Sequence, residues 1–309
     1  MLCILADICN LIQKSIEGGE VMADLGLMEL LGLGKLTGCS VTQRIKQIKQ
    51  PRGGYINPKM LNAVSIGEGI ELLNPEENVH ASLVGLAVDY LTRFMLGEKA
   101  KNAFRISIKG AGIIGEAGKA AKLVAGVKGL DNKSITNAVK LSGYDVCFRA
   151  GIMGYKPVDK INPDKQTIDN IRTMVERSLK FFEQYGPKVL DGFTFEGGYT
   201  DIVSTGDGDF TTPDTLWDFK VSKLPVKKEH TLQLLMYWRM GLHSIHSEFN
   251  TVKFLGIYNP RMNCIYRIAV SDIPADVISE VEREVIGYKA KVQLLSWQNK
   301  RAKRGRNQK

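Results

Sequence analysis

The 309-residue sequence has no run of about 18 apolar residues, the length that a helix needs to cross a bilayer. Its apolar start, Met1 to Leu11, carries Asp7 and lacks both a basic leading segment and a small-residue cleavage pattern, so no signal peptide is expected. We therefore expect no membrane partner and a cytoplasmic location.

Cysteine pairs are also missing. The five cysteines are scattered and include no C-x-x-C pair, which argues against a disulfide framework and against a four-cysteine zinc or iron–sulfur site. Free thiols in a reducing compartment are expected. The sequence contains neither a G-x-S-x-G nucleophile motif nor a phosphate-binding lysine loop.

The basic charge is unevenly distributed. Net charge is +9, but residues 298–309 alone hold six basic residues and no acid, which leaves +3 for the rest of the chain. This tail is either a solubilising appendage or an electrostatic arm for phosphate backbones.

The pattern along the chain predicts an α/β protein with a mixed sheet flanked by helices. We expect an N-terminal extension of unknown role at 1–75, a domain at 76–297 with a mainly helical insertion at about 97–185, and the basic tail at 298–309. Apolar spacing predicts helices over 77–95, 163–185, 229–245 and 271–297. Alternation predicts strands over 193–203, 216–222, 251–258 and 265–270, with turn residues at 204–214.

One glycine pattern suggests a nucleotide cofactor. Gly110, Gly112 and Gly115 form a G-x-G-x-x-G after the strand-like residues 104–109, as in a dinucleotide-binding turn. The acidic residue that should bind ribose about 20 positions later is missing, because Asp131 lies in a turn. A glycine-rich linker or a helix entry is the alternative.

A second pattern favours metal chemistry. Asp201 ends one predicted strand and Asp218 lies in the next, so a hairpin between these strands would bring the two carboxylates together. Strand alternation puts Asp218 and Lys220 on one face. Two adjacent carboxylates repel unless a cation neutralises them, and Mg²⁺ prefers carboxylate and carbonyl oxygens. The main-chain carbonyl of Phe219 would lie close enough to act as a third ligand. An ordinary hairpin with Asp and Lys on its solvent face is the alternative.

Two helices add to this pattern. Gln233 and Tyr237 are four residues apart and therefore share a helix face. On the earlier helix, Gly85, Asp89 and Arg93 form one stripe among apolar neighbours.

These motifs resemble the PD-(D/E)XK nucleases, in particular the RecB-like branch. That branch has a helix with G-x-x-x-H, a strand ending in G-x-x-D, a strand with D/E-x-K and a helix with Q-x-x-x-Y. The corresponding residues here are Gly85 with Asp89 in place of the histidine, Gly198 with Asp201, Asp218 with Lys220, and Gln233 with Tyr237. The resemblance covers roughly 80–95 and 190–270.

The resemblance implies a restriction-endonuclease-like fold and a metal-dependent deoxyribonuclease, with exonuclease activity as one form. It implies Mg²⁺ or Mn²⁺ held by Asp201, Asp218 and the Phe219 carbonyl, with Asp89 as a further ligand. Lys220 would support the nucleophile, and Gln233 and Tyr237 would position the scissile phosphate. DNA is the implied partner, in repair, recombination, replication or phage defence with other proteins. The rivals are an inactive nucleic-acid-binding module on the same fold and a dinucleotide enzyme using Gly110–Gly115.

Overall fold

The computed structural model describes residues 38–66 and 72–289. The compact unit that contains them begins at Cys39. Residues 39–66, which the sequence analysis assigned to an N-terminal extension ending at residue 75, belong to this unit and supply a strand to its sheet. The basic tail predicted at 298–309 lies outside the described residues.

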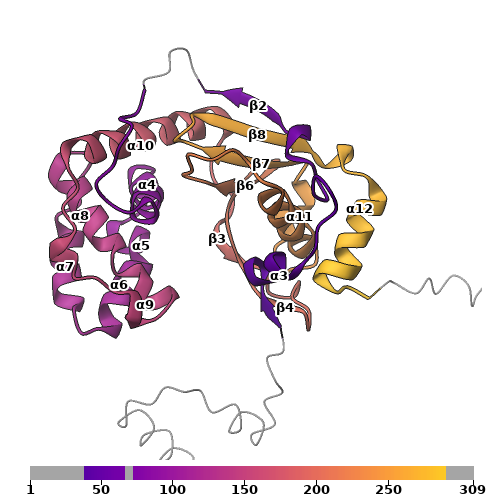
Figure 1. The fold of residues 1–309 in the computed structure, drawn as a ribbon, viewed down its shortest axis with the longest axis horizontal. Coiled ribbons are helices and arrows are strands. Elements are labelled where there is room, and N and C mark those ends of the chain that lie inside the picture. Colours follow the sequence, from indigo (N-terminus) through magenta and orange to yellow (C-terminus); the bar gives the residue numbers. More distant parts are fainter. Residues whose placement is uncertain (1–37, 67–71, 290–309) are drawn as a thin grey trace, which may run out of the picture. The chain divides into compact units, whose positions relative to one another are not determined.

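A mixed sheet of six strands forms the centre of this unit, in the order β2-β8-β7-β6-β5-β3 (Figure 1). β6 and β7 are parallel, and every other pair of neighbours in this sheet is antiparallel. The strands are β2 (Asn62–Ser65), β3 (Asp191–Thr194), β5 (Asp207–Thr212), β6 (Thr215–Phe219), β7 (Phe254–Asn259) and β8 (Cys264–Ala269). β1 (Cys39–Ser40) and β4 (Val203–Thr205) form a separate parallel pair.

Helices flank the sheet, which confirms the predicted α/β class. The α-helices are α3 (Val41–Gln47), α4 (Ala81–Met95), α5 (Ala100–Ala103), α6 (Arg105–Ile113), α7 (Ala117–Ala125), α8 (Asn132–Ser142), α9 (Asp145–Arg149), α10 (Lys165–Tyr185), α11 (Lys228–Leu242) and α12 (Ala275–Glu280). A π-helical turn, η6 (Val281–Ile286), follows α12 directly. Short 3-10 turns are η1 (Pro58–Met60), η2 (Ile152–Gly154), η3 (Val158–Lys160), η4 (Ser247–Thr251) and η5 (Val270–Asp272). Within the described ranges, no helix combines the length and the apolar character needed to cross a membrane.

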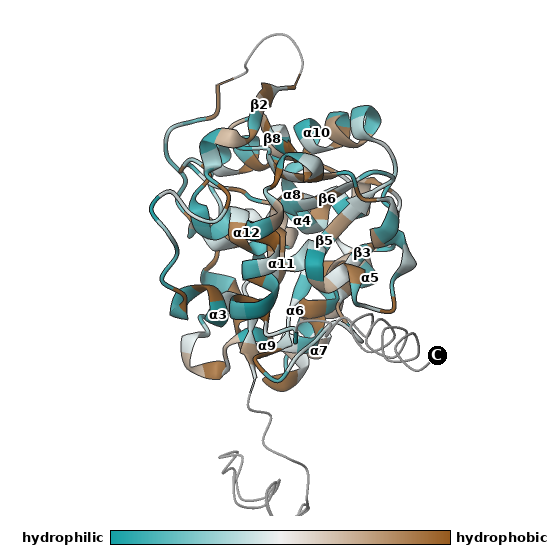
Figure 2. Ribbon diagram, turned by 90° about the vertical axis from the view of Figure 1, so that its right-hand side faces the viewer, coloured by the Kyte–Doolittle hydropathy of each residue, from teal (hydrophilic) through white to brown (hydrophobic). Residues whose placement is uncertain are grey.

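Two helices cover opposite faces of the sheet. On one face, Leu232 and Leu235 of α11 pack with Leu216 of β6 in one apolar cluster. On the other face, Phe181 of α10 lies edge-on to Trp217, with ring centroids 4.8 Å apart. The short helix α3 is also amphipathic, and Figure 2 shows both hydrophobic and hydrophilic residues on it. Alternate residues of β6 therefore enter different cores, as strand geometry requires.

Residues 97–185, where the sequence predicts a mainly helical insertion, contain α5 to α10, and several of these helices share an apolar core with α4. The strand expected at 104–109 is wrong, because these residues begin α6. Gly110 and Gly112 lie inside this helix and Gly115 follows it. The strand–turn–helix context that a dinucleotide fingerprint requires is therefore missing at this place.

The strand prediction at 193–203 is also wrong. Only 191–194 form β3, and the chain then turns before the short β4. Residues predicted as a turn, 204–214, contain β5, and the hairpin turn itself is Pro213-Asp214.

The helix expected over 271–297 begins later, at Ala275, and the helical residues end before Gly287, which has a left-handed φ of 92°. Residues 290–297 lie outside the described residues.

Candidate active site

Two aspartates face each other across the hairpin of β5 and β6. Phe210 pairs with Trp217, so the next residues along each strand, Asp209 and Asp218, stand opposite one another. Residues directly opposite in an antiparallel pair project to the same face. Asp218 is 2% exposed, and Asp209 is partly buried.

The surroundings of Asp209 disfavour its charged form. Burial raises its pKa to about 7, with further contributions from the carboxylates of Asp218 and Asp89, while Lys220 opposes the shift. One oxygen, Oδ2, accepts a hydrogen bond from the backbone N–H of Phe219 at 2.7 Å. Burial is thus the main cause of the raised pKa, and the neighbouring carboxylates add to it.

Asp218 and Lys220 form the expected pair on one face. Lys220 Nζ lies 2.9 Å from Oδ1 of Asp218. The other carboxylate oxygen of Asp218, Oδ2, is buried and has no hydrogen-bond partner among the described residues. Burial alone would lower the pKa of Lys220, but Asp218 and Asp209 more than offset it, so the pKa is raised. Lys220 is therefore a permanent cation beside the two acids.

α11 brings a hydrogen-bonded pair to the same place. Gln233 Nε2 donates to Tyr237 Oη at 2.8 Å, as their four-residue spacing predicts. The Tyr237 hydroxyl is buried, and burial followed by the charges of Asp218 and Asp209 raises its pKa. One turn earlier lies His230, whose pKa is lowered by burial and then by Lys220. His230 was not among the residues that the sequence indicated, although its i−3 position relative to Gln233 puts it on the same face.

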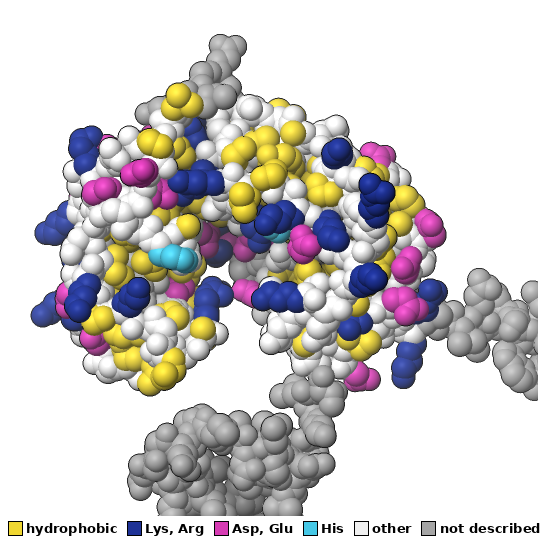
Figure 3. All heavy atoms as spheres, viewed as in Figure 1, with side chains coloured by type: hydrophobic (Ala, Val, Ile, Leu, Met, Phe, Trp, Pro, Cys, Tyr) yellow, Lys and Arg dark blue, Asp and Glu magenta, His cyan; other side chains and the backbone are white. Residues whose placement is uncertain are grey.

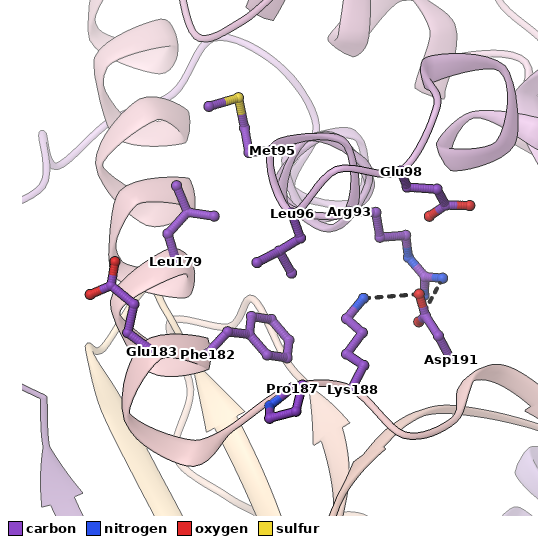
Figure 4. Close-up of a pocket in the computed structure, with 10 residues that line it drawn as sticks. All are labelled: Arg93, Met95, Leu96, Glu98, Leu179, Phe182, Glu183, Pro187, Lys188 and Asp191. Atoms are coloured by element: carbon purple, nitrogen blue, oxygen red, sulfur yellow. Dashed lines mark hydrogen bonds and ion pairs between the residues drawn. The ribbon is translucent and has the colours of Figure 1, made fainter.

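α4 passes along the edge of the sheet next to Asp209. Asp89 Oδ1 accepts from Arg93 Nε at 2.9 Å, and Arg93 Nη1 lies 2.9 Å from Asp191 Oδ1 on β3. Beyond these residues opens a cavity of about 690 Å³ between α4 and α10, with Lys188 also directed at Asp191 (Figure 4). Asp89 is near the aspartate pair, but its carboxylate is bound to Arg93.

Asp201 does not join this group. It lies exposed in the loop before β4, where the neighbouring Thr200 hydroxyl donates to the carbonyl of Ile286. The hairpin that would have brought Asp201 to Asp218 does not exist, because β6 pairs with β5. Asp209 occupies the position that the sequence analysis gave to Asp201.

The G-x-x-D spacing of Gly198 and Asp201 has a structural explanation. A Cβ at Gly198 would stand 2.2 Å from the carbonyl oxygen of Met240, so this glycine lets the loop pack against the end of α11. The same spacing recurs at Gly206 and Asp209. That second match was the available signal, and it lies closer to Asp218 in the sequence.

The donor set fits a hard divalent cation. Asp209, Asp218 and the main-chain carbonyl of Phe219 offer the oxygens that Mg²⁺ and Mn²⁺ prefer, and the unpartnered Oδ2 of Asp218 is free to bind. No group of three or more His, Cys, Asp or Glu side chains suited to a metal occurs in residues 38–66 and 72–289. A cation held by these two carboxylates would therefore need main-chain or solvent oxygens to complete its coordination shell.

The site lies where the helical region and the sheet face each other. Arg149 of α9 approaches Asp207 of β5 at 4.0 Å, and Arg93 of α4 binds Asp191 of β3. Figure 3 shows the surface hollowed between these parts, with basic and acidic side chains at the rim.

Comparison with protein-family models, with curated proteins and with solved structures finds no match to this chain.

Proposed function

We propose that the protein is a metal-dependent phosphodiesterase that cleaves DNA, with the RecB-like active site of a PD-(D/E)XK nuclease. The observation that carries the proposal is the opposed pair Asp209 and Asp218 with Lys220 beside it. Two carboxylates that face each other across a hairpin are costly without a cation, and the lysine beside them supplies a charge suited to a phosphoryl oxygen.

The order of elements supports the same proposal. Helix α4 with Asp89, strand β5 with Asp209, strand β6 with Asp218 and Lys220, and helix α11 with Gln233 follow each other as in that branch. This order also favours the restriction-endonuclease-like arrangement of the sheet. When the G-x-x-D motif is assigned to Gly206 and Asp209 instead of Gly198 and Asp201, its aspartate lies in a strand.

Each residue has a defined part in the reaction. Asp209, Asp218 and the Phe219 carbonyl would hold the ion, and Lys220 orients the attacking water and stabilises negative charge on the phosphorane. Gln233 and Tyr237 position the scissile phosphate through their amide and hydroxyl groups. The bound ion supplies Lewis-acid polarisation of the phosphoryl oxygen and lowers the pKa of water.

The second candidate is a binding module of the same fold that does not cut. Such a module would have no need for a buried, unpartnered carboxylate oxygen at Asp218 or for a lysine held against it. The dinucleotide alternative loses its support, since the glycines of Gly110–Gly115 lie in and after a helix.

One experiment tests the proposal directly. The purified protein is incubated with linear and circular, single- and double-stranded DNA in Mg²⁺, Mn²⁺ or EDTA, and products are resolved by gel electrophoresis. We expect cleavage with either metal and none in EDTA. Intact DNA under all metal conditions, together with measurable binding, would favour the binding module.

A further inference from the structure

The helical insertion carries most of the net positive charge of the described residues. Between residues 97 and 143 there are nine lysines and arginines against three acids, a net charge of +6. A basic surface of this density is typical of proteins that contact phosphate backbones. The charge lies on helices that supply none of the residues assigned to cleavage.

Part of this charge converges on one cavity. Between α7 and α8 lies a cavity of about 490 Å³. Four lysines line it, namely Lys119 and Lys122 from α7, Lys128 from the connection and Lys133 from α8. Lys119 is bound to Asp159 and Glu116. Lys122, Lys128 and Lys133 are exposed, and none of the three has an acidic partner among the described residues.

The connection between the two helices is fixed in shape. Ser134 is 1% exposed, and its hydroxyl accepts from the backbone N–H of Lys128 at 3.0 Å and donates to Asp131. Asp131 is the acid among the lining residues, and it caps α8 by accepting from the N–H groups of Lys133 and Ser134. Its charge is thus engaged by the helix end, while the lysines remain available to a ligand.

We propose that the cavity between α7 and α8 is a second nucleic-acid site, in which Lys122, Lys128 and Lys133 bind backbone phosphates of the strand that is cut elsewhere. The site is electrostatic and reads no sequence, because lysine binds phosphate as a point charge. The identity of the ligand as nucleic acid rests on the proposed function. The cavity and its free charges stand independently of it.

The test removes these charges without removing the fold. Lys122, Lys128 and Lys133 are changed together to Gln, which keeps helix propensity and a polar surface. A control variant changes Lys59, Lys180 and Lys253 to Gln, three exposed lysines that line no part of the cavity. Circular dichroism checks that both variants remain folded.

Binding of labelled single- and double-stranded 30-mers is measured by fluorescence anisotropy in EDTA at several salt concentrations. Each lost phosphate contact lowers the slope of log K against log salt by about 0.7–0.9, so the cavity variant should lose roughly 2–3 in slope. Its affinity should fall about tenfold or more, and the control should change far less. Equal loss in both variants, or no loss in the cavity variant, would overturn the proposal.

Two further arms separate the possible failures. Cleavage of a small chromogenic phosphodiester with Mn²⁺ should be unchanged in the cavity variant, because that substrate cannot reach the lysines. If the wild type does not cleave DNA but binds it in a way that depends on the three lysines, the proposed function is rejected and this binding site remains supported. Lysine-dependent binding of inorganic tripolyphosphate without any effect on DNA binding would assign the cavity to a free polyphosphate and overturn the proposal.

Discussion

Asp209 and Asp218 stand opposite each other on β5 and β6, and a buried oxygen of Asp218 has no hydrogen-bond partner in the part of the chain that the structure describes. Lys220 compensates one of these two negative charges. Burial is the first cause of the raised pKa of Asp209, which is about 7, and repulsion by the carboxylate of Asp218 is the second. A divalent cation bound between the two carboxylates would remove this repulsion.

The first prediction compares two aspartates that both follow a glycine by three positions. Asp209→Asn should abolish cleavage because it replaces a charged metal ligand by a neutral amide, while Asp201→Asn should cut at nearly the wild-type rate from its exposed loop. DNA binding by the Asp209 variant should persist, since a negative charge near the phosphate is lost. Rates are measured on linear DNA with Mg²⁺. Loss of activity in the Asp201 variant alone would move the site back to that loop.

The second prediction concerns stability and pH in the absence of metal. The pKa of Asp209 is near 3.8 when unfolded and about 7 when folded, so the folded state binds more protons between these values. Stability should therefore fall as pH rises from about 4 to 7. In EDTA at pH 8, Asp209→Asn should melt at a higher temperature than the wild type, by roughly 2–4 °C for each kcal/mol of repulsion removed. Mn²⁺ should stabilise only the wild type. A lower melting temperature for the variant in EDTA would contradict this electrostatic account.

The third prediction concerns Lys220. Lys220→Ala should lower turnover by roughly 100- to 1000-fold, the usual loss when one group that stabilises transition-state charge is removed. Lys223→Ala is the matched control, because Lys223 is exposed and donates to the carbonyl of Pro75. Steady-state cleavage rates are compared after both variants are shown to fold. Equal rates for the two variants would make the D-x-K motif a coincidence.

The fourth prediction separates packing from cofactor binding in the glycine-rich helix. A Cβ at Gly110 would stand 2.0 Å from the carbonyl oxygen of Tyr144, whereas nothing lies within 4 Å of a Cβ at Gly112. Gly110→Ala should destabilise the protein by about 1–3 kcal/mol. Gly112→Ala should stabilise it by about 0.5–1 kcal/mol, the helix preference of alanine over glycine. Denaturant unfolding measures both, and loss of activity in a stable Gly112 variant would revive the dinucleotide site.

The fifth prediction concerns the basic tail. Deleting residues 298–309 removes six cations and should flatten the salt dependence of DNA binding, by up to roughly 4–5 in slope. Anisotropy titrations at several salt concentrations measure the slope. An unchanged slope would identify the tail as a solubilising segment.

The sequence was sufficient for features that depend on local periodicity. Apolar spacing predicted helices over 163–185 and 229–245, and the structure has α10 (Lys165–Tyr185) and α11 (Lys228–Leu242) there, because one face of each helix enters an apolar core. Strand alternation likewise predicted that Asp218 and Lys220 lie together, and Lys220, the residue after β6 ends, lies 2.9 Å from Asp218. Gln233 and Tyr237 needed only the four-residue repeat of a helix.

The error at β5 arose from tertiary packing. Residues 207–212 read DGDFTT, a composition typical of turns. A Cβ at Gly208 would stand 2.3 Å from the ring of Phe193 on β3, so this glycine admits a neighbouring aromatic ring and marks no bend. The buried Phe210, Thr211 and Thr212 complete the strand. Local propensity cannot reveal a partner that lies on another strand.

The pairing of β2 with β8 has a consequence for synthesis. Asn62 pairs with Arg267, so β2 is made early and its neighbour in the sheet only near the end of the described residues. At about 5–20 residues per second, β2 leaves the ribosome roughly 10–40 s before β8 is available. During this interval the nascent chain carries an unpaired strand with Val64 on its surface. The first part of this sheet to be translated is thus among the last to be completed.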